Sequence, residues 1–323
     1  MLLVYDGDRN KTKLTSANYK FQKIAYFSTY FPRYSESAVY REFLKLVELE
    51  FEVESIALYS SDPGPIPNDA MGLMDSTVAI EDIGFLSRTS THLKRMFTSP
   101  IKYWKAFFKQ LFDAPFFKRK RFETLKLFSA GVMLARTVEK KKIEHLHVHH
   151  ADKPASVALT AHRLTGIPYS ITSYSKDLFG KNPDLKAKLE NATWVTTISR
   201  FHKNYLLDFD PFLEKEKVEV VPVGVDLSIF TPEKDEKNLL QKPRVLAITR
   251  LTQNSGVDLL IKASKILASL NVDFETVIVG DGPERERLQS ITNKLRLNRH
   301  VRLAGARRIE EILDLMRKAD VFV

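Results

Sequence analysis

Four of the protein's eight histidines fall within the six residues HLHVHH, from His145 to His150. His145, His147 and His149 alternate along this stretch, so a β-strand would point their three imidazoles the same way. Imidazoles gathered at the end of a strand suit either a metal ion or a polar ligand. No carboxylate–histidine pattern lies nearby to complete a zinc site. The pattern therefore favours buried or ligand-facing histidines, and we expect no bound metal.

These histidines belong to a chain in which strand patterns alternate with helix patterns. Before residue 231 the sequence predicts strands at 23–31, 53–60, 143–150, 168–175, 193–199 and 218–224. Helical patterns cover 37–49, 154–166, and 93–142 with breaks at Pro100 and Pro115. The helix over 154–166 has Pro154 at its start and Gly166 at its end, the usual asymmetry of helix ends. His149 and His150 thus end a strand directly before a helix.

A charged segment with a proline near each end, at 231–243, is typical of a linker, and the alternation restarts after it. Four further strand patterns follow, at 244–250, 274–280, 301–306 and 320–323. We therefore expect a polar leader (1–20), a first domain (21–230), the linker, and a second domain (244–323). Alternating strands and helices indicate an α/β fold with mainly parallel sheets in both domains. Such sheets bind ligands at the carboxyl ends of their strands.

The composition is that of an ordinary globular protein with an excess of positive charge. Of 323 residues, 44% are hydrophobic and 28% charged, and the net charge of +10 predicts an anionic partner. The absence of cysteine excludes disulfides and a thiol nucleophile. The first residues lack a signal-peptide pattern, and no apolar run is long enough to cross a bilayer. We expect a cytoplasmic protein.

Several segments together resemble the family 4, or group 1, glycosyltransferases, which transfer sugars from nucleotide donors. YFSTYFPRYSESAVYREF is similar to the family's FP-x-x-SET-F-x-x-E segment, and HLHVHHADKPASVALTAHRLTGIPYSITSYSKDLF to its HIHAHFA…GIPYSFTAHAxDIF stretch. VEVVPVGVDLSIFTP resembles the hinge pattern V-x-PNGVDxxxFxP. RVLAITRLTQNSGVDLLIKASKIL and the later VIVGDGPERERL resemble RLVxKKGxxxLIxA…VGxGPxxxxL. The order and spacing of these motifs make the resemblance specific.

The resemblance implies the GT-B fold, with two Rossmann-like domains, and transfer with retention of configuration. The acceptor residues that it implies in the first domain are Ser35, Glu36, His149 and Tyr174, the last two also being the catalytic candidates. The donor residues that it implies in the second domain are Arg250, Ser255, Gly256 and Gly280, and the hinge residues are Gly224 and Asp226. No cofactor and no metal are implied. The donor substrate is a nucleotide sugar, and the acceptor is a glycan or a lipid-linked molecule.

Arg250 suits the chemistry of such a donor site. The leaving group is a nucleoside diphosphate, so negative charge grows there as the glycosidic bond breaks, and preorganised positive charge stabilises it. Arg250 follows the first strand of the second domain and can form a fork onto phosphate oxygens. The loop 252–256 leads into a helix whose N-terminus adds oriented N–H groups. A surface ion pair is the alternative role for this arginine.

Three residues depart from the family's pattern. Tyr174 replaces a histidine near the reacting sugar, and tyrosine cannot become a cation at neutral pH. Ser255 replaces a lysine and brings no charge to the diphosphate, and Lys262 lies too far along the helix to substitute for it. Val223 replaces an asparagine at the hinge, a milder change.

The sequence ends at DVFV, where the family continues into LPSxxEGxP and a pair of glutamates that contact the donor. We therefore expect a truncated second domain and no measurable sugar transfer by this chain. Two interpretations stay open: a glycosyltransferase, or an inactive remnant or binding partner that keeps the first domain. Arg250 favours the enzyme, whereas Tyr174, Ser255 and the chain end favour the remnant. A metal-dependent hydrolase that uses the histidines is the least favoured interpretation.

The region 94–126 combines ten lysines and arginines with only two acidic residues and nine interleaved aromatics. In IKYWKAFFKQLF the apolar set follows helical spacing and lysines line another face. One role is a core-facing helix with a solvated basic face. The other is a surface that docks on anionic lipid, which would place the protein at the cytoplasmic face of a membrane. Nucleic acid is a less favoured partner, because no recognition motif accompanies the charge.

Overall fold

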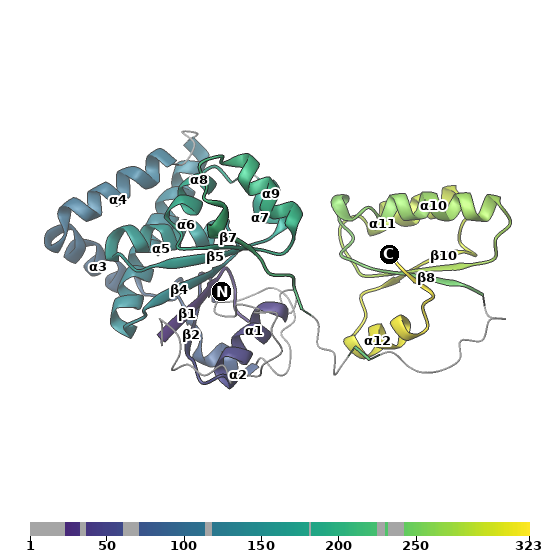
Figure 1. Ribbon diagram of the computed structural model, residues 1–323, viewed down its shortest axis with the longest axis horizontal. Helices are drawn as coiled ribbons and strands as arrows, with labels where there is room; N and C mark the ends of the chain where they lie inside the picture. Colours follow the sequence, from purple (N-terminus) through teal and green to yellow (C-terminus); the bar gives the residue numbers. More distant parts are fainter. Residues whose placement is uncertain are drawn as a thin grey trace. The chain divides into compact units, whose positions relative to one another are not determined.

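A computed structural model describes residues 23–32, 37–60, 71–113, 118–180, 182–224, 230–231 and 242–323. The chain divides into two compact units, Met1–Gly224 and Val225–Val323, each of which is described by itself (Figure 1). The leader expected at 1–20 and most of the linker expected at 231–243 lie outside the described residues. The expected domain boundaries therefore stay predictions.

The first unit is built on a seven-stranded parallel sheet with the order β3-β2-β1-β4-β5-β6-β7. Its strands are β1 (Lys23–Ser28), β2 (Glu52–Ala57), β3 (Val78–Ala79), β4 (His145–His149), β5 (Tyr169–Ser173), β6 (Val195–Thr197) and β7 (Val218–Val220). Six of these strands match the predicted ones. The prediction missed β3, which pairs with the end of β2 over two residues only and is too short to show an alternating pattern.

Helices cover both faces of this sheet (Figure 1). They are α1 (Ser37–Glu48), α2 (Met71–Ser76), α3 (Phe85–Thr98), α4 (Pro100–Asp113), α5 (Lys118–Lys141), α6 (Lys153–Thr165), α7 (Ser175–Phe179), α8 (Leu185–Asn191) and α9 (Arg200–Phe209). α1 lies on one face, where Phe43 packs against Ile24 and Tyr26 of β1. α5 and α6 lie on the other face. The predicted ends of α6 are confirmed, since Gly166 terminates it with a left-handed φ of 82°.

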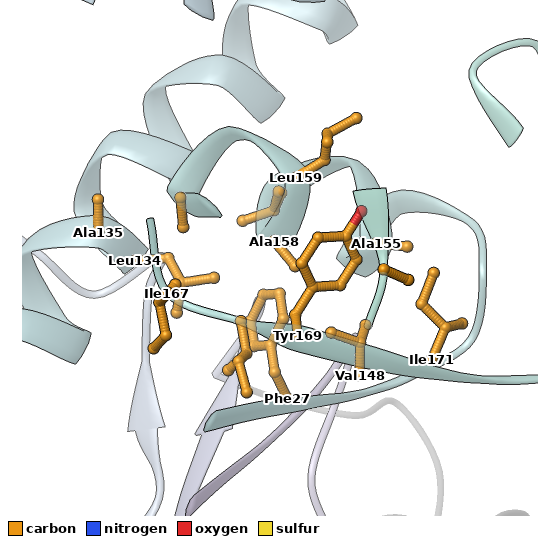
Figure 2. Close-up of a cluster of buried hydrophobic side chains, with 14 of the residues drawn as sticks. Phe27, Leu134, Ala135, Val148, Ala155, Ala158, Leu159, Ile167, Tyr169 and Ile171 are labelled. Carbon is orange, nitrogen blue, oxygen red and sulfur yellow. The ribbon is translucent and has the colours of Figure 1, made fainter. Parts of the chain in front are cut away.

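The main core lies between the sheet and the pair α5–α6. Phe27, Val148 and Tyr169 project from β1, β4 and β5 into it and are fully buried (Figure 2). Tyr169 keeps its polar end satisfied by donating its hydroxyl proton to the Lys188 carbonyl oxygen at 2.7 Å. α5 and α6 approach closely at Gly131, where an added Cβ would lie 2.4 Å from the Thr160 Cβ. Only glycine fits there without a shift of one helix.

The second unit contains a four-stranded parallel sheet with the order β10-β9-β8-β11. Its strands are β8 (Arg244–Ile248), β9 (Glu275–Val279), β10 (Val301–Gly305) and β11 (Val321–Phe322), and its helices are α10 (Val257–Ser269), α11 (Arg285–Lys294) and α12 (Ile309–Arg317). α10 and α11 pack on one face of the sheet and α12 on the other (Figure 1). The four strands expected after residue 243 are confirmed, and so is the α/β fold with two parallel sheets.

The aromatic side of α4 is turned to solvent rather than to the core. Four side chains form this exposed row, which we call the α4 apolar row: Ile101 (82% exposed), Trp104, Phe108 and Phe112 (73%). The buried residues of α4 are instead Tyr103, Ala106 and Gln110. Gln110 accepts a hydrogen bond from the Thr160 hydroxyl at 3.0 Å, so a polar contact fixes the buried face. The core-facing role considered for the apolar set is therefore wrong for most of it. Within the described residues, no helix is both long and apolar enough to span a bilayer.

Candidate functional site

The carboxyl ends of β1 and β4 mark the point where the first sheet changes direction. The chain runs from β1 outward to β2 and β3, then returns to β4 on the other side of β1. Parallel α/β sheets bind ligands at such a switch point, because the two crossovers leave in opposite directions and open a crevice. His149 is the last residue of β4 and lies at this edge.

His149 is fully buried and has one ring nitrogen without a partner. Its ring lies against the Tyr26 ring, with centroids 5.0 Å apart, and its Nδ1 is 3.4 Å from the Tyr174 hydroxyl. Its Nε2 has no hydrogen-bond partner within the described part of the chain. Burial, with a smaller contribution from the His150 charge, lowers the pKa of His149 to about 3. The imidazole is therefore neutral at physiological pH and can exchange one hydrogen bond with a ligand.

His145 and His147, by contrast, are tied to hydroxyl groups of the neighbouring strand. The two ring nitrogens of His147 lie 2.7 Å from the Ser170 hydroxyl and 3.0 Å from the Thr172 hydroxyl. Burial holds the pKa of His147 well below its ordinary value. His145 lies 2.8 Å from the Ser170 hydroxyl and stacks on Trp194. These two histidines are bound to hydroxyl groups of β5 in the core, whereas His149 lies at the carboxyl end of β4.

One group of three potential metal ligands occurs in the described residues. Glu42, His147 and His149 each offer a ligand atom, and these atoms lie within 4.8 Å of one another. Glu42 already accepts a hydrogen bond from the Tyr26 hydroxyl at 2.7 Å. A metal here would have to displace a hydroxyl partner of His147. That no metal binds stays a prediction.

Asp177 joins the two loops that flank His149. Its buried carboxylate accepts hydrogen bonds from the backbone N–H groups of Ala151 and Tyr174, both at 3.0 Å. The same carboxylate lies 3.1 Å from Nδ1 of His150, a residue held at a left-handed φ of 75°. The loop after β4 and the loop after β5 are thereby fixed to each other. Asp177 was not among the predicted site residues, although it stands at an aspartate of the family's pattern in the segment SYSKDLF.

Lys188 holds the loop after β4 through hydrogen bonds to its backbone. Its side chain is fully buried, and its Nζ donates to the carbonyl oxygens of Ala151 and Asp152 at 2.9 and 3.1 Å. Its charge is balanced by Asp184 at 2.8 Å, and the Asn182 side chain accepts a further bond at 2.6 Å. Burial lowers the pKa of Lys188, while Asp184 opposes this shift. The sequence did not predict this role, because the contacts of Lys188 arise only from the tertiary structure.

Two of the four expected acceptor residues lie in the described part of the structure. His149 and Tyr174 lie together, with Tyr174 half-buried at the N-terminus of α7. Ser35 and Glu36 lie outside the described residues. Of the expected hinge residues, Gly224 is the last residue of the first unit and is exposed, and Asp226 lies outside the described residues.

In the second unit, Arg250 lies at the carboxyl end of β8, beside the loop that follows β9. The N–H of Leu251 donates to the Asp281 carbonyl at 3.0 Å, which binds the two loops together. A Cβ at Gly280 would lie 1.9 Å from the Thr249 carbonyl oxygen, and one at Gly282 would lie 2.3 Å from that of Leu251. These contacts require glycine at both positions, of which only Gly280 was among the predicted donor residues.

The guanidinium of Arg250 is exposed and has no hydrogen bond or ion pair with the described residues. The surface ion pair considered for it is therefore not found in this part of the chain. Ser255 donates its hydroxyl proton to the Thr252 carbonyl at 2.8 Å and so closes its own turn. Gly256 follows with a left-handed φ of 71° and begins α10. The N–H groups of the first turn of α10 add a favourable dipole for an anion at this edge.

Two family descriptions match consecutive parts of the chain. Residues 91–229 match the family described as Glycosyltransferase Family 4. Residues 230–323 match the family described as Glycosyl transferases group 1. The two matches together cover both units from α3 onward.

Curated relatives match parts of the chain. The phosphatidylinositol N-acetylglucosaminyltransferase gpi3 subunit of Schizosaccharomyces pombe is 26% identical over 213 residues, which are 61% of this chain and 44% of that protein. The GDP-mannose-dependent alpha-(1-6)-phosphatidylinositol monomannoside mannosyltransferase of Mycolicibacterium smegmatis is 31% identical over 140 residues, which are 41% of this chain and 36% of that protein. The matches span less than half of the length of each relative.

A solved structure of similar fold is that of the Anabaena protein HepE in complex with UDP-glucose. Its TM-score is 0.61 at 14% identity, and the match covers 93% of this chain and 73% of that one. At this identity the likeness concerns the fold.

Proposed function

The chain belongs to the group 1 glycosyltransferases with the GT-B fold, and from this premise we propose that it is a glycosyltransferase-like protein, whose first unit carries the acceptor site and whose second unit carries the donor site for transfer of a sugar from a nucleotide-sugar donor to a glycan or lipid-linked acceptor. The observation that carries the proposal is the exposed Arg250 just after β8, at the carboxyl edge of the second sheet, whose guanidinium has no partner among the described residues. The relatives named above support it, since one is described as using GDP-mannose and HepE was solved with UDP-glucose. The names of the two curated relatives include phosphatidylinositol and so favour a lipid-linked acceptor.

On the donor side, the proposed chemistry is stabilisation of the departing diphosphate. Arg250 donates a forked pair of hydrogen bonds to phosphate oxygens, and the N–H groups after Gly256 add an oriented dipole. These donors are fixed before the reaction, so they cost no reorganisation as charge develops. Gly280 and Gly282, on either side of Asp281, add no side chain of their own, so the nucleotide can approach the backbone at these two positions.

On the acceptor side, His149 binds the sugar and is not the base that removes a proton. A histidine whose pKa is about 3 is a weak base, so it is unsuited to deprotonating a sugar hydroxyl. Its Nε2, which has no partner among the residues described, instead exchanges a hydrogen bond with the bound sugar, while Asp177 fixes the loop around it. The departing phosphate then takes the proton of the acceptor hydroxyl, in line with transfer with retention.

The donor assignment is tested by calorimetry with UDP, GDP and ADP. In Arg250→Ala, loss of a charge-assisted bond worth about 1.5–3 kcal/mol is expected to weaken binding roughly tenfold to a hundredfold. The matched control is Arg299→Ala, an exposed arginine just before β10 at the opposite edge of the sheet. Equal affinities for the parent and Arg250→Ala would remove Arg250 from the site. Nucleotide binding without any turnover of a nucleotide sugar would favour the non-catalytic binding partner.

The acceptor proposal includes a membrane surface, because the α4 apolar row is exposed beside lysines of the same helix. An amphipathic helix with this pattern lies in the lipid interface and buries its apolar side among the headgroups. Ile101→Ser/Phe112→Ser is expected to lower vesicle binding at least tenfold, since burying each large apolar side chain contributes about 1.5–3 kcal/mol.

Vesicle binding is measured in two ways, by flotation and by the fluorescence emission of Trp104, which should move to shorter wavelength on insertion. A control, Leu259→Ser/Leu270→Ser, removes two exposed apolar residues from α10 and its C-cap in the second unit and is expected to bind as the parent does. If the α4 variant floats as well as this control, α4 does not dock.

A further inference from the structure

A pocket of about 380 Å³ opens between α4 and the ends of α6 and α8. Lys102, Lys105 and Lys109 line it from α4, and His162 and Arg163 line it from the last turn of α6. The three lysines stand three and four residues apart, so they share one side of α4. The pocket therefore gathers four permanent positive charges around one space.

Arg163 lines this pocket, and one of its guanidinium nitrogens is buried beside it. Its side chain is only 10% exposed, and its Nη2 pairs with Asp113 at 2.6 Å. Its Nη1 is buried and lacks a hydrogen-bond partner among the residues described. A buried donor without an acceptor is costly, so the pocket is better satisfied when an anion occupies it.

The lysines are not neutralised by carboxylates. None of the three forms an ion pair with any described residue, and Asp113 is the one acidic partner found for Arg163 in the same part of the chain. The C-terminal ends of α6 and α8 add about half a negative charge each. These ends and Asp113 offset about two of the four positive charges, so a net positive charge remains for a ligand.

The pocket is separate from the site at His149. Residues 162–166 lie at the end of α6, whereas His149 and His150 precede its start. The 13 residues of α6 set these ends about 20 Å apart. The pocket therefore does not belong to the transfer site.

The pocket adjoins the α4 apolar row. Lys105 and Lys109 are followed three residues later by Phe108 and Phe112, so each lysine neighbours an aromatic ring along the helix. Apolar side chains beside a cationic pocket match the two parts of a phospholipid, whose phosphate is joined to acyl chains. A soluble phosphate compound would gain nothing from the exposed rings.

We propose that this pocket binds the phosphate of an anionic phospholipid while the α4 apolar row enters the bilayer beside it. The proposal rests on the membrane docking proposed above and adds a choice of lipid to it. Arg163 binds the phosphate at the base of the pocket, and the three lysines surround the remaining oxygens. Docking then depends on headgroup charge as well as on apolar contact.

The test is flotation of the full chain with vesicles of phosphatidylcholine alone or mixed with phosphatidylglycerol. The parent is expected to prefer the mixed vesicles. Lys102→Gln/Lys105→Gln/Lys109→Gln should lose most of this preference, about fivefold per lysine. The matched control, Lys262→Gln/Lys265→Gln/Lys294→Gln, removes the same charge from the exposed surface of the second unit and should keep the preference. Equal losses in the two triple variants would overturn the pocket and leave only general attraction of a basic protein.

A competition experiment distinguishes the phosphate of a lipid from a free phosphate. Inorganic phosphate, compared with chloride at equal ionic strength, should reduce the lipid preference of the parent but not that of the α4 lysine variant. If phosphate binds the chain in calorimetry while the lipid preference survives the lysine substitutions, the pocket takes a free phosphate and the lipid assignment is wrong. The docking proposal fails separately, when Ile101→Ser/Phe112→Ser binds phosphatidylcholine vesicles as the parent does.

Discussion

Between pH 6.5 and pH 4, the first unit is expected to lose about 1.4 kcal/mol of stability per pH unit from His149, and His147 adds a loss in the same direction. Burial lowers the pKa of both in the folded chain, to about 3 for His149. The unfolded chain takes up protons near pH 6.5, whereas the folded chain does not, so acid favours unfolding. The stability that the neutral, buried histidines contribute is fully present above pH 6.5 and is lost as the pH falls toward their pKa in the folded chain.

Urea unfolding of the first unit at several pH values between 4 and 7 measures this slope. His149→Gln removes one of the two groups, so its slope should be smaller by about 1.4 kcal/mol per pH unit. His300→Gln, which removes a histidine of the second unit, should leave the slope of the first unit unchanged. A slope in His149→Gln equal to that of the parent would show that His149 is protonated in the folded chain.

Replacing Lys188 by methionine is expected to destabilise the first unit by about 3–5 kcal/mol. The substitution keeps the volume but removes a buried cation, so Asp184 and the carbonyls of Ala151 and Asp152 lose their shared donor. The loop between β4 and α6 should then open more often, which weakens the position of His149 at its start.

Chemical denaturation measures the stability, and hydrogen exchange at the N–H of Ala151 reports on the loop. Lys45→Met provides the control, since Lys45 forms an exposed pair with Glu48 and such pairs contribute about 0–1 kcal/mol. A loss in Lys188→Met no larger than in Lys45→Met would mean that the buried network adds nothing to stability.

The sequence predicted the alternation of strands and helices well, but it did not predict which side of α4 is buried. Ten of the eleven strands in the described residues match a predicted strand, and the missed one, β3, has only two residues. The helical spacing of Ile101, Trp104 and Phe108 correctly indicated one apolar side. It did not indicate which side meets the core, since the buried face of α4 is fixed by hydrogen bonds such as that between Gln110 and Thr160.

The candidate site shows the same limit at the level of single residues. The alternation of His145, His147 and His149 predicted one common side for all three. Their different roles arise from β5, whose register places Ser170 opposite His147 and Thr172 opposite His149. This register depends on tertiary structure, as do the contacts of Asp177, so the local pattern could not reveal either.

The separate hydrophobic clusters of the two units have a thermodynamic consequence. The clusters of the first unit lie within residues 24–218, and those of the second within 246–319. Each unit can therefore unfold in a cooperative transition of its own, and one melting temperature does not describe the chain. With about 0.7 kcal/mol of enthalpy per residue, calorimetry should resolve a larger heat for the unit of 224 residues than for the unit of 99. Acid then lowers the temperature of the larger peak, and the smaller peak serves as an internal reference.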